Sequence, residues 1–282
     1  MIKLSGLVWV LLIAAPAAAQ ELFVSTEPAS NMAAGSLGLR LNSSLYRMDQ
    51  IGGYRYRLDP ELMFGVNRNL MLHLNIYSSD IYQQNLRVEG AGLYAKYRFF
   101  SNDDLQSHFR MAVFGKISLV GNPEILRSGN LDYTSDEVDL DGNNSGIQAG
   151  LVATQLIHKL ALAASVSYTD RWENLDAVKL PGQPGQAANY TFSAGYLLWP
   201  RVYKNFRETN INLYIEFLGS SLLDQGSYYL DAAPAIQFIF NSISRLDFSY
   251  RAQLAGDMTR FSKNQLFVRY EYNFLNVFKT RR

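Results

Sequence analysis

The sequence predicts an all-β fold, a single antiparallel up-and-down transmembrane β-barrel of about 12 strands. Apolar and polar residues alternate along most segments, and charged side chains occur in the middle of those segments. Beyond the N-terminal apolar run, no stretch approaches the ~20 apolar residues that a membrane helix needs. The segment 266–274, LFVRYEYNF, has both features, because Arg269 and Glu271 alternate with apolar and aromatic residues. A strand puts these two sets on opposite faces.

The N-terminal residues 1–19 are typical of a secretory signal peptide. Lys3 precedes an apolar run at 7–15, and Ala17 and Ala19 form an A-x-A cleavage pattern. A membrane anchor is the alternative, but the run is short for a bilayer and lacks a basic stop-transfer flank. We expect residues 20–34 to form an N-terminal periplasmic segment. The chain has no cysteine, so neither a disulfide nor a cysteine-linked lipid is available to it.

The predicted barrel occupies residues 35–278, and a basic C-terminal tail, 279–282, follows it. Its alternating segments are near or above the ~9–11 residues that cross a membrane at a tilt. Turn-forming sequences such as MDQIGG, NRN, HK and NSIS separate them. In chain order the predicted strands are 36–46, 54–66, 70–79, 90–100, 108–120, 146–157, 160–172, 189–199, 210–219, 228–240, 245–254 and 266–274.

The connections differ in length by parity. The odd-numbered ones include the long stretch 121–144 and KLPGQPGQ, whereas the even-numbered ones include the short NRN, HK and NSIS. Short periplasmic turns and longer outer loops are typical of outer-membrane barrels, and an even strand count returns the C-terminus to the periplasm. SNDDLQS and PRVYKNFRET are longer than this rule expects. Net charge is +1, which offers no electrostatic case for nucleic-acid binding.

The alternation also predicts which side chains face the lumen. Ile211, Leu213, Ile215 and Phe217 exemplify the register that we expect to face lipid. Charges in the opposite register would be costly in a dry core, but a wet lumen removes the conflict. The predicted lumen-lining residues are Arg40, Arg55, Arg57, Asp59, Glu61, His73, Lys96, Arg98, Arg110, Lys116, Glu216, Asp247, Arg251, Arg269 and Glu271. The strand around GLVATQLIH alternates poorly and its faces are not assigned.

On these segments the chain resembles the bacterial outer-membrane β-barrel class, across nearly all of its mature length. The terminal LFVRYEYNF is similar to the aromatic closing strand that such proteins present to the barrel-assembly machinery, although LNVFKTRR continues past it. PAIQFIF followed by RLDFSYRAQL is similar to outer-membrane transporters of the phenol-degradation meta-pathway type. This narrower resemblance implies passage of small solutes.

Three features suggest more specific sites. Trp199, Tyr203, Tyr46, Trp172 and Tyr228 lie near predicted strand ends, which favours interfacial aromatic girdles over an aromatic patch that binds sugar or phenol. EVDLDGN, at 137–143, spaces its acids like part of a calcium loop, but Gln148 occupies the closing position. We expect a solvated acidic loop there, open to divalent-ion bridges with lipopolysaccharide. His73 reads as a hydrogen-bonded lumen residue, since no nucleophile motif such as G-x-S-x-G accompanies it.

Three function classes remain open. The first is an outer-membrane channel or transporter for passive diffusion of small anionic or aromatic solutes, because basic residues outnumber acids in the predicted lumen. The second is a structural barrel whose lumen is closed by ion pairs, and the third, an outer-membrane lipase or protease, is less favoured. We expect an integral protein of a Gram-negative outer membrane, in contact with lipids and lipopolysaccharide, with no cofactor and no enzyme activity.

Overall fold

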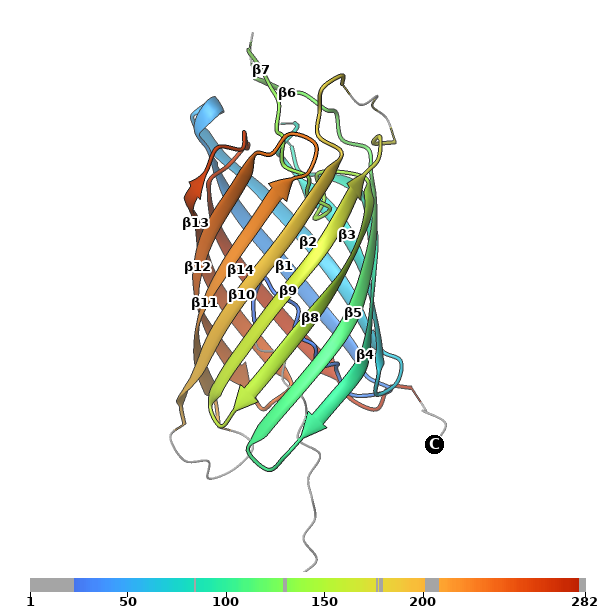
Figure 1. Cartoon of the computed structure of the whole chain (residues 1–282), viewed down its shortest axis with the longest axis vertical. Coiled ribbons are helices and arrows are strands. Elements are labelled where there is room, and N and C mark those ends of the chain that lie inside the picture. The colour runs from blue at the N-terminus through green and yellow to red at the C-terminus, as the bar shows by residue number, and fades with distance from the viewer. Residues whose placement is uncertain are drawn as a thin grey trace, which may run out of the picture.

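The alternating segments close into one antiparallel barrel (Figure 1). The computed structural model describes residues 23–83, 85–128, 131–175, 177, 180–200 and 208–278. The barrel order is β1-β14-β13-β12-β11-β10-β9-β8-β5-β4-β3-β2, with β1 and β14 closing the ring. The barrel strands are β1 Leu37–Met48, β2 Gly53–Gly65, β3 Leu70–Ser79, β4 Arg87–Asp103, β5 Ser107–Val120, β8 Gly146–Ile157, β9 Leu160–Arg171, β10 Gln186–Trp199, β11 Asn210–Leu222, β12 Tyr228–Phe240, β13 Ser244–Gly256 and β14 Asn264–Phe274.

The all-β prediction and its twelve-stranded barrel are confirmed. Three strands, β3, β8 and β12, have the bounds that alternation predicts. Strand β4 is longer than predicted because a bulge between Arg98 and Phe100 lets its pairing with β5 continue to Asp103. The long connection holds two further strands, β6 Leu126–Ser128 and β7 Leu131–Tyr133, which are too short for a periodic signal. A 3-10 helix, Asp49–Ile51, joins β1 to β2. Within the described residues, no helix has the length and apolar character needed to cross a membrane.

The barrel has two unlike ends. At the end that we call the loop end, the connections include the long stretches 121–145 and 172–185, and β6 and β7 project there (Figure 1). At the opposite end, the turn end, the connections 66–69, 104–106, 158–159 and 241–243 are short. The connection 200–209 is longer, and most of it lies outside the described residues. The sorting of loop length by parity therefore holds over the described connections.

Adjacent residues on one strand face different surroundings. On β11, Leu213 is 45% exposed on the outer surface, whereas Asn212 is 3% exposed and its amide donates to Gln237 Oε1 at 3.1 Å. Strand alternation produces this contrast. Of the residues predicted to form aromatic girdles, Trp172, Trp199 and Tyr228 are exposed at or next to strand ends, and the girdle itself stays a prediction. Tyr46 contradicts that prediction, because β1 continues to Met48 and the register turns Tyr46 inward, next to Arg57. Tyr203 lies outside the described residues.

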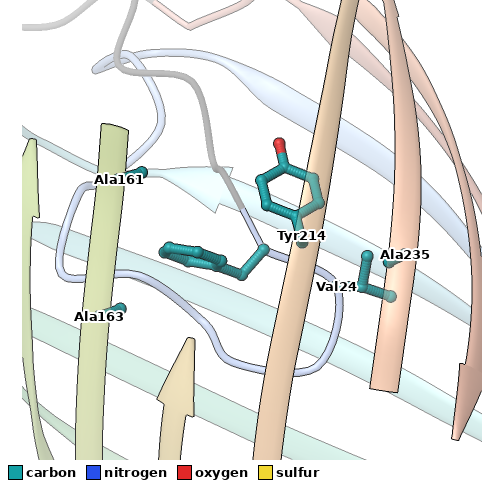
Figure 2. Close-up of a cluster of buried hydrophobic side chains, with 6 residues drawn as sticks. Val24, Ala161, Ala163, Tyr214 and Ala235 are labelled. Carbon is teal, nitrogen blue, oxygen red and sulfur yellow. The ribbon is translucent and has the colours of Figure 1, made fainter. Parts of the chain in front are cut away.

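Residues 23–36, called here the N-terminal segment, lie inside the barrel. This corrects the expectation that 20–34 form a periplasmic segment, as far as those residues are described. The segment crosses the lumen toward the turn end and then enters β1 (Figures 1 and 2). At its end, Gly35 N donates to Gly65 O at 2.6 Å, and Gly65 N donates to Ser36 O at 3.0 Å. A Cβ on Gly65 would lie 2.1 Å from Ala33 O, so this close approach requires glycine.

Proline interrupts two ladders in the barrel wall. Between β2 and β3, pairing stops at Arg57↔Ser79 and resumes at Glu61↔Asn75, with Pro60 in the interval. The backbone N–H of Ser78 donates there to the Asp59 carboxylate at 3.2 Å. Between β12 and β13 the interval contains Pro234, whose carbonyl accepts from Ser249 Oγ at 3.2 Å. Proline offers no N–H to a ladder, so side chains take over one of the lost backbone bonds at each site.

Candidate functional site

A cavity of about 390 Å³ lies inside the barrel, between the N-terminal segment and the connection 121–145. Its walls differ in chemistry. Strands β8, β9 and β10 present neutral polar side chains, whereas β1, β2 and β14 present charged ones. The neutral wall consists of Gln148, Ser165, Ser167, Asn189 and Thr191, and the charged wall includes Arg40, Asp59, Glu61 and Arg269. Val24–Glu27 border the cavity on the side of the N-terminal segment.

Glu216 of β11 binds the main chain of the N-terminal segment. Its carboxylate accepts the backbone N–H groups of Val24, Ser25 and Thr26 at 2.9, 2.8 and 2.8 Å. Charge-assisted bonds of this kind are about twice as strong as neutral ones. Glu216 is fully buried, so these donors replace the water that the carboxylate has lost. Nearby, Phe23 and Val24 pack against a cluster that includes Tyr214 (Figure 2).

Lys96 of β4 holds the next part of the segment. Its ammonium donates to Pro28 O at 2.6 Å and to Ser30 O at 2.8 Å, and it lies 3.4 Å from Glu27 Oε1. Glu27 also pairs with Arg40 at 3.3 Å. Burial alone would raise the pKa of Glu27, but the charges of Lys96 and Arg40 hold it well below its ordinary value. Glu27 is therefore ionised inside the barrel at neutral pH.

The second inserted element is the stretch 134–145, called here the inner loop, which folds from the loop end into the barrel. Arg57 binds it by donating to Asp141 O at 2.6 Å, Gly142 O at 3.2 Å and Asn143 Oδ1 at 2.8 Å. Lys116 forms an ion pair with Asp141. Gly142 has φ +93°, and a Cβ there would lie 3.1 Å from the Arg57 guanidinium carbon. Glycine thus permits both the turn and the contact.

On the opposite side, the inner loop is held through Glu137. Arg260 Nη2 pairs with Glu137 at 3.0 Å, and its Nη1 pairs with Asp231 at 2.9 Å. Arg251 also pairs with Asp231, at 2.6 Å. The expectation of a solvated acidic loop is therefore corrected for Glu137, which protein cations engage. Among the described residues, no cluster of metal-binding side chains is found.

A further ion-pair network connects β13, β14, β1 and β2. Arg40 stands opposite Glu271 on one side and Glu61 on the other in the strand register. Its guanidinium bonds Glu271 at 2.8 Å and Glu61 at 3.4 Å, while Arg245 pairs with Glu271. His73 contacts Glu61 through Nδ1, and its ring lies 4.9 Å from the Tyr94 ring. His73 is thus engaged with a carboxylate, in agreement with the hydrogen-bonded reading of this residue.

The structure places the predicted lumen residues in two groups. Seven of them border the cavity: Arg40, Asp59, Glu61, His73, Lys116, Arg251 and Arg269. The others share the inward register but lie away from the cavity surface: Arg55, Arg57, Lys96, Arg98, Arg110, Glu216, Asp247 and Glu271. Of these, Arg57, Lys96, Glu216, Asp247 and Glu271 are buried, whereas Arg55, Arg98 and Arg110 are half-buried.

Sequence reasoning missed most acidic partners of the inward cations. Glu27 and Glu137 lie outside the strands, where alternation carries no information, and Glu89 and Asp231 lie near strand ends. Asp231 lies within the predicted strand 228–240, and alternation there would have found it, whereas Glu89 precedes the predicted strand 90–100, where the β3–β4 register shifts. The acids that border the cavity are Glu27, Asp59, Glu61, Glu137, Asp139, Asp141 and Asp231, and the cations are Arg40, Lys116, Arg251, Arg260, Lys263 and Arg269. The predicted excess of inward positive charge is therefore absent from this described cavity.

Closing strand β14 pairs with β1 along its whole length and with β13 from Asn264 to Tyr272. The chain continues beyond it, and Phe278 N donates to Gly35 O at 2.9 Å, while the Phe278 ring lies 6.3 Å from Phe64. The described chain end is therefore fixed beside the start of β1. The basic tail 279–282 and the signal peptide 1–19 lie outside the described residues.

No protein-family model matches the sequence, and no curated protein matches it. Among solved structures, the COG4313 outer membrane channel from Pseudomonas putida F1 is similar at a TM-score of 0.55, with 12% identity over 89% of this chain and 100% of that one. NanC porin is similar at 0.48, with 9% identity over 86% and 100%. KdgM porin is similar at 0.45, with 11% identity over 85% and 99%.

These identities are low enough that the likeness concerns the fold alone. The narrower resemblance to meta-pathway transporters is not shown by these matches and stays a prediction. The described chain has the closed antiparallel barrel fold found in bacterial outer-membrane channels.

Proposed function

We propose that the protein is a channel for passive diffusion of small solutes across the outer membrane of a Gram-negative bacterium. The observation that supports this function is the polar cavity of about 390 Å³ inside the barrel. A polar cavity of this size has room for water and for small solutes. The turn end would face the periplasm, as short connections do in such barrels. In this arrangement the N-terminal segment narrows the path on its periplasmic side.

The cavity walls favour small polar solutes that carry no net charge. Most inward cations have a carboxylate or carbonyl partner, so a charged solute would gain little from them. The neutral wall, by contrast, offers hydroxyl and amide groups that can donate and accept. The preference for anionic or aromatic solutes, expected from sequence, stays a prediction. Reversal potentials in a salt gradient distinguish a preference for uncharged solutes from a preference for anions. Paired wall charges should give weak ion selectivity, whereas an anion preference should move the reversal potential clearly away from zero.

Single-channel recording in planar bilayers tests the channel itself. We expect small, steady conductance from the full mature chain, and larger conductance from a variant that lacks residues 23–30, since those residues occupy the lumen. Heat-denatured protein is the control. Liposome swelling with uncharged polyols of increasing size gives the cut-off. Absence of conductance and of swelling from the mature chain would contradict a channel.

A structural barrel with a closed, ion-paired lumen is the second candidate. The inserted N-terminal segment and inner loop, both held by buried charges, support it. The two candidates differ in one measurement, because a closed barrel conducts only after residues 23–30 are removed. An outer-membrane lipase or protease stays the least favoured class, and hydrolysis of ester and peptide substrates by purified protein tests it.

The partners follow from the same placement. We propose that lipid and lipopolysaccharide contact the outer surface and that β14 engages the barrel-assembly machinery. Cross-linking from outward positions of β14 during assembly in cells tests the second contact. Labelling that is equal on β14 and on a strand such as β9 would contradict it.

A further inference from the structure

Asp247 and Arg269 face each other without bonding. They are directly opposite on β13 and β14, a position where opposite charges normally pair. Asp247 is fully buried, and neither of its carboxylate oxygens accepts a hydrogen bond among the described residues, although Gln237 stands opposite it on β12 with its amide nitrogen also unbonded. A buried, unpaired carboxylate is costly. The ion pair that this strand register would allow is therefore not formed.

The guanidinium of Arg269 is occupied elsewhere. Its Nε donates to Asn42 Oδ1 at 3.1 Å, its Nη1 donates to Phe23 O at 3.2 Å, and its Nη2 donates to Val24 O. Phe23 and Val24 belong to the N-terminal segment. The inserted segment thus takes the donors that Asp247 would otherwise receive. The two terminal nitrogens of Arg269 therefore have competing acceptors, which are the carbonyls of the N-terminal segment and the Asp247 carboxylate of the barrel wall.

Glu216 acts in the opposite direction. Its three main-chain hydrogen bonds, to Val24, Ser25 and Thr26, exist only while the segment is inserted. Withdrawal of the segment would leave Glu216 without those donors, whereas it would let Arg269 turn to Asp247. Glu216 therefore favours the inserted position of the N-terminal segment, whereas Asp247 favours its withdrawal.

We propose that Arg269 exchanges between the carbonyls of the inserted N-terminal segment and the carboxylate of Asp247, so that Asp247 favours withdrawal of the segment and Glu216 favours insertion. The inference rests on the proposed function only in that withdrawal would widen the channel. The exchange makes the segment a two-state element, whose balance shifts with the difference in interaction between the states. Asp247 and Glu216 are positioning residues in this scheme.

The two acids give opposite expected shifts when neutralised. Asp247→Asn removes a charge that is unpaired in the inserted state and paired in the withdrawn state, so the equilibrium shifts toward the inserted state. Glu216→Gln leaves one weaker acceptor for three N–H groups, so the equilibrium shifts toward the withdrawn state. Losing one charge-assisted interaction shifts such an equilibrium about tenfold. If the two acids only stabilised the fold, both substitutions would be expected to shift the insertion equilibrium in the same direction.

Thiol labelling measures the segment directly, because the chain has no cysteine of its own. Ala29 is fully buried inside the barrel, packed near Ala112 and Val152, so Ala29→Cys reacts with a maleimide–polyethylene glycol only when the segment withdraws. We expect the rate in the full chain, held in detergent micelles, to fall about tenfold with Asp247→Asn and to rise about tenfold with Glu216→Gln. Asp224→Asn, at the exposed loop end, is the charge-matched control.

Heat-modifiable gel migration establishes that each variant is folded before labelling. A rate that is unchanged or faster with Asp247→Asn overturns the exchange, as does a cysteine at 29 that reacts in no variant. Labelling reports the segment whether or not the protein conducts. Failure of the proposed channel would appear separately, as absence of conductance from every variant.

Discussion

Arg57 of β2 donates to Glu89 of β4 at 3.0 Å, across the intervening strand β3, and both side chains are shielded from solvent. The same guanidinium binds the inner loop through Gly142 O. One side chain therefore joins the barrel wall to the element that folds into its mouth. Sequence alone presents Arg57 as a lumen charge free to meet solutes, whereas its contacts are structural.

Arg57→Gln is expected to destabilise the protein by about 3–5 kcal/mol, because it leaves Glu89 buried without its cation. The inner loop should also lose backbone protection at 141–143. Hydrogen exchange of that loop and the temperature of heat-modifiable unfolding measure the two effects. Arg55→Gln, two residues away and half-buried, is the matched control and should change both little. Equal effects at the two positions would contradict the anchoring role.

Leu213→Arg tests the outward face. Leu213 is 45% exposed in mid-strand, and an arginine facing lipid near the bilayer midplane costs about 2–4 kcal/mol. The unfolding temperature in lipid should fall accordingly.

A control for that variant must face the cavity. Asn212 is inward but nearly fully buried against Gln237, so an arginine would not fit there. Asn189→Arg, on the half-exposed neutral wall, is the better match and should be tolerated. Damage at 189 as large as that at 213 would mean that the faces are assigned wrongly.

Fractionation tests the membrane location. The protein should be recovered in the outer-membrane fraction and should migrate faster on gels before boiling than after it, because a closed barrel has no unpaired strand edge at which unfolding can begin. Recovery in the soluble periplasm would contradict the proposed location.

Asp139 predicts a pH dependence of the inner loop. Partial burial, together with the carboxylates of Asp141 and Glu137, raises the pKa of Asp139 to about 6. An acid whose pKa is higher in the folded state favours folding at low pH, and this contribution is lost as pH rises from about 4 to about 6. The pKa values of Glu137 and Asp141 are lowered instead, mainly by Arg260 and Lys116 overcoming burial, so their contributions change only below about 4.

Hydrogen exchange of residues 137–145, corrected for intrinsic rates, should therefore show protection that falls between pH 4 and 6. Asp139→Asn should flatten this dependence and leave the loop better protected at pH 7. The same slope in both proteins would contradict the assignment to Asp139.

Alternation predicted the inward register of Asp247 and Arg269, since both lie in strands with a clear period of two. It did not predict that Asp247 and Arg269 form no ion pair. The acceptors that Arg269 binds instead are the main-chain carbonyls of residues 23 and 24, which leave no pattern in the sequence. Tyr46 was misplaced for a different reason. It lies six residues after Arg40, so the same period of two that predicts Arg40 inward also turns Tyr46 inward, and the girdle prediction used only its place at the predicted strand end.

The inserted elements were beyond sequence reasoning for a related cause. The N-terminal segment and the inner loop have no periodicity, and their insertion depends on partners such as Lys96 and Arg260, which are distant in the chain. The charges in the middle of strands indicated that each needs a hydrogen-bonding or ionic partner. Water, a solute or another residue can equally be that partner. Only the fold distinguishes among these.

Glu216 binds the N-terminal segment through main-chain N–H groups, so these hydrogen bonds do not depend on the side chains of Val24, Ser25 and Thr26. Over evolutionary time the segment could change its residues widely and still be held, provided that no proline removes a donor. The wall residue has no such freedom. Distant relatives would then be easier to recognise by one acid on a strand than by the peptide that it holds.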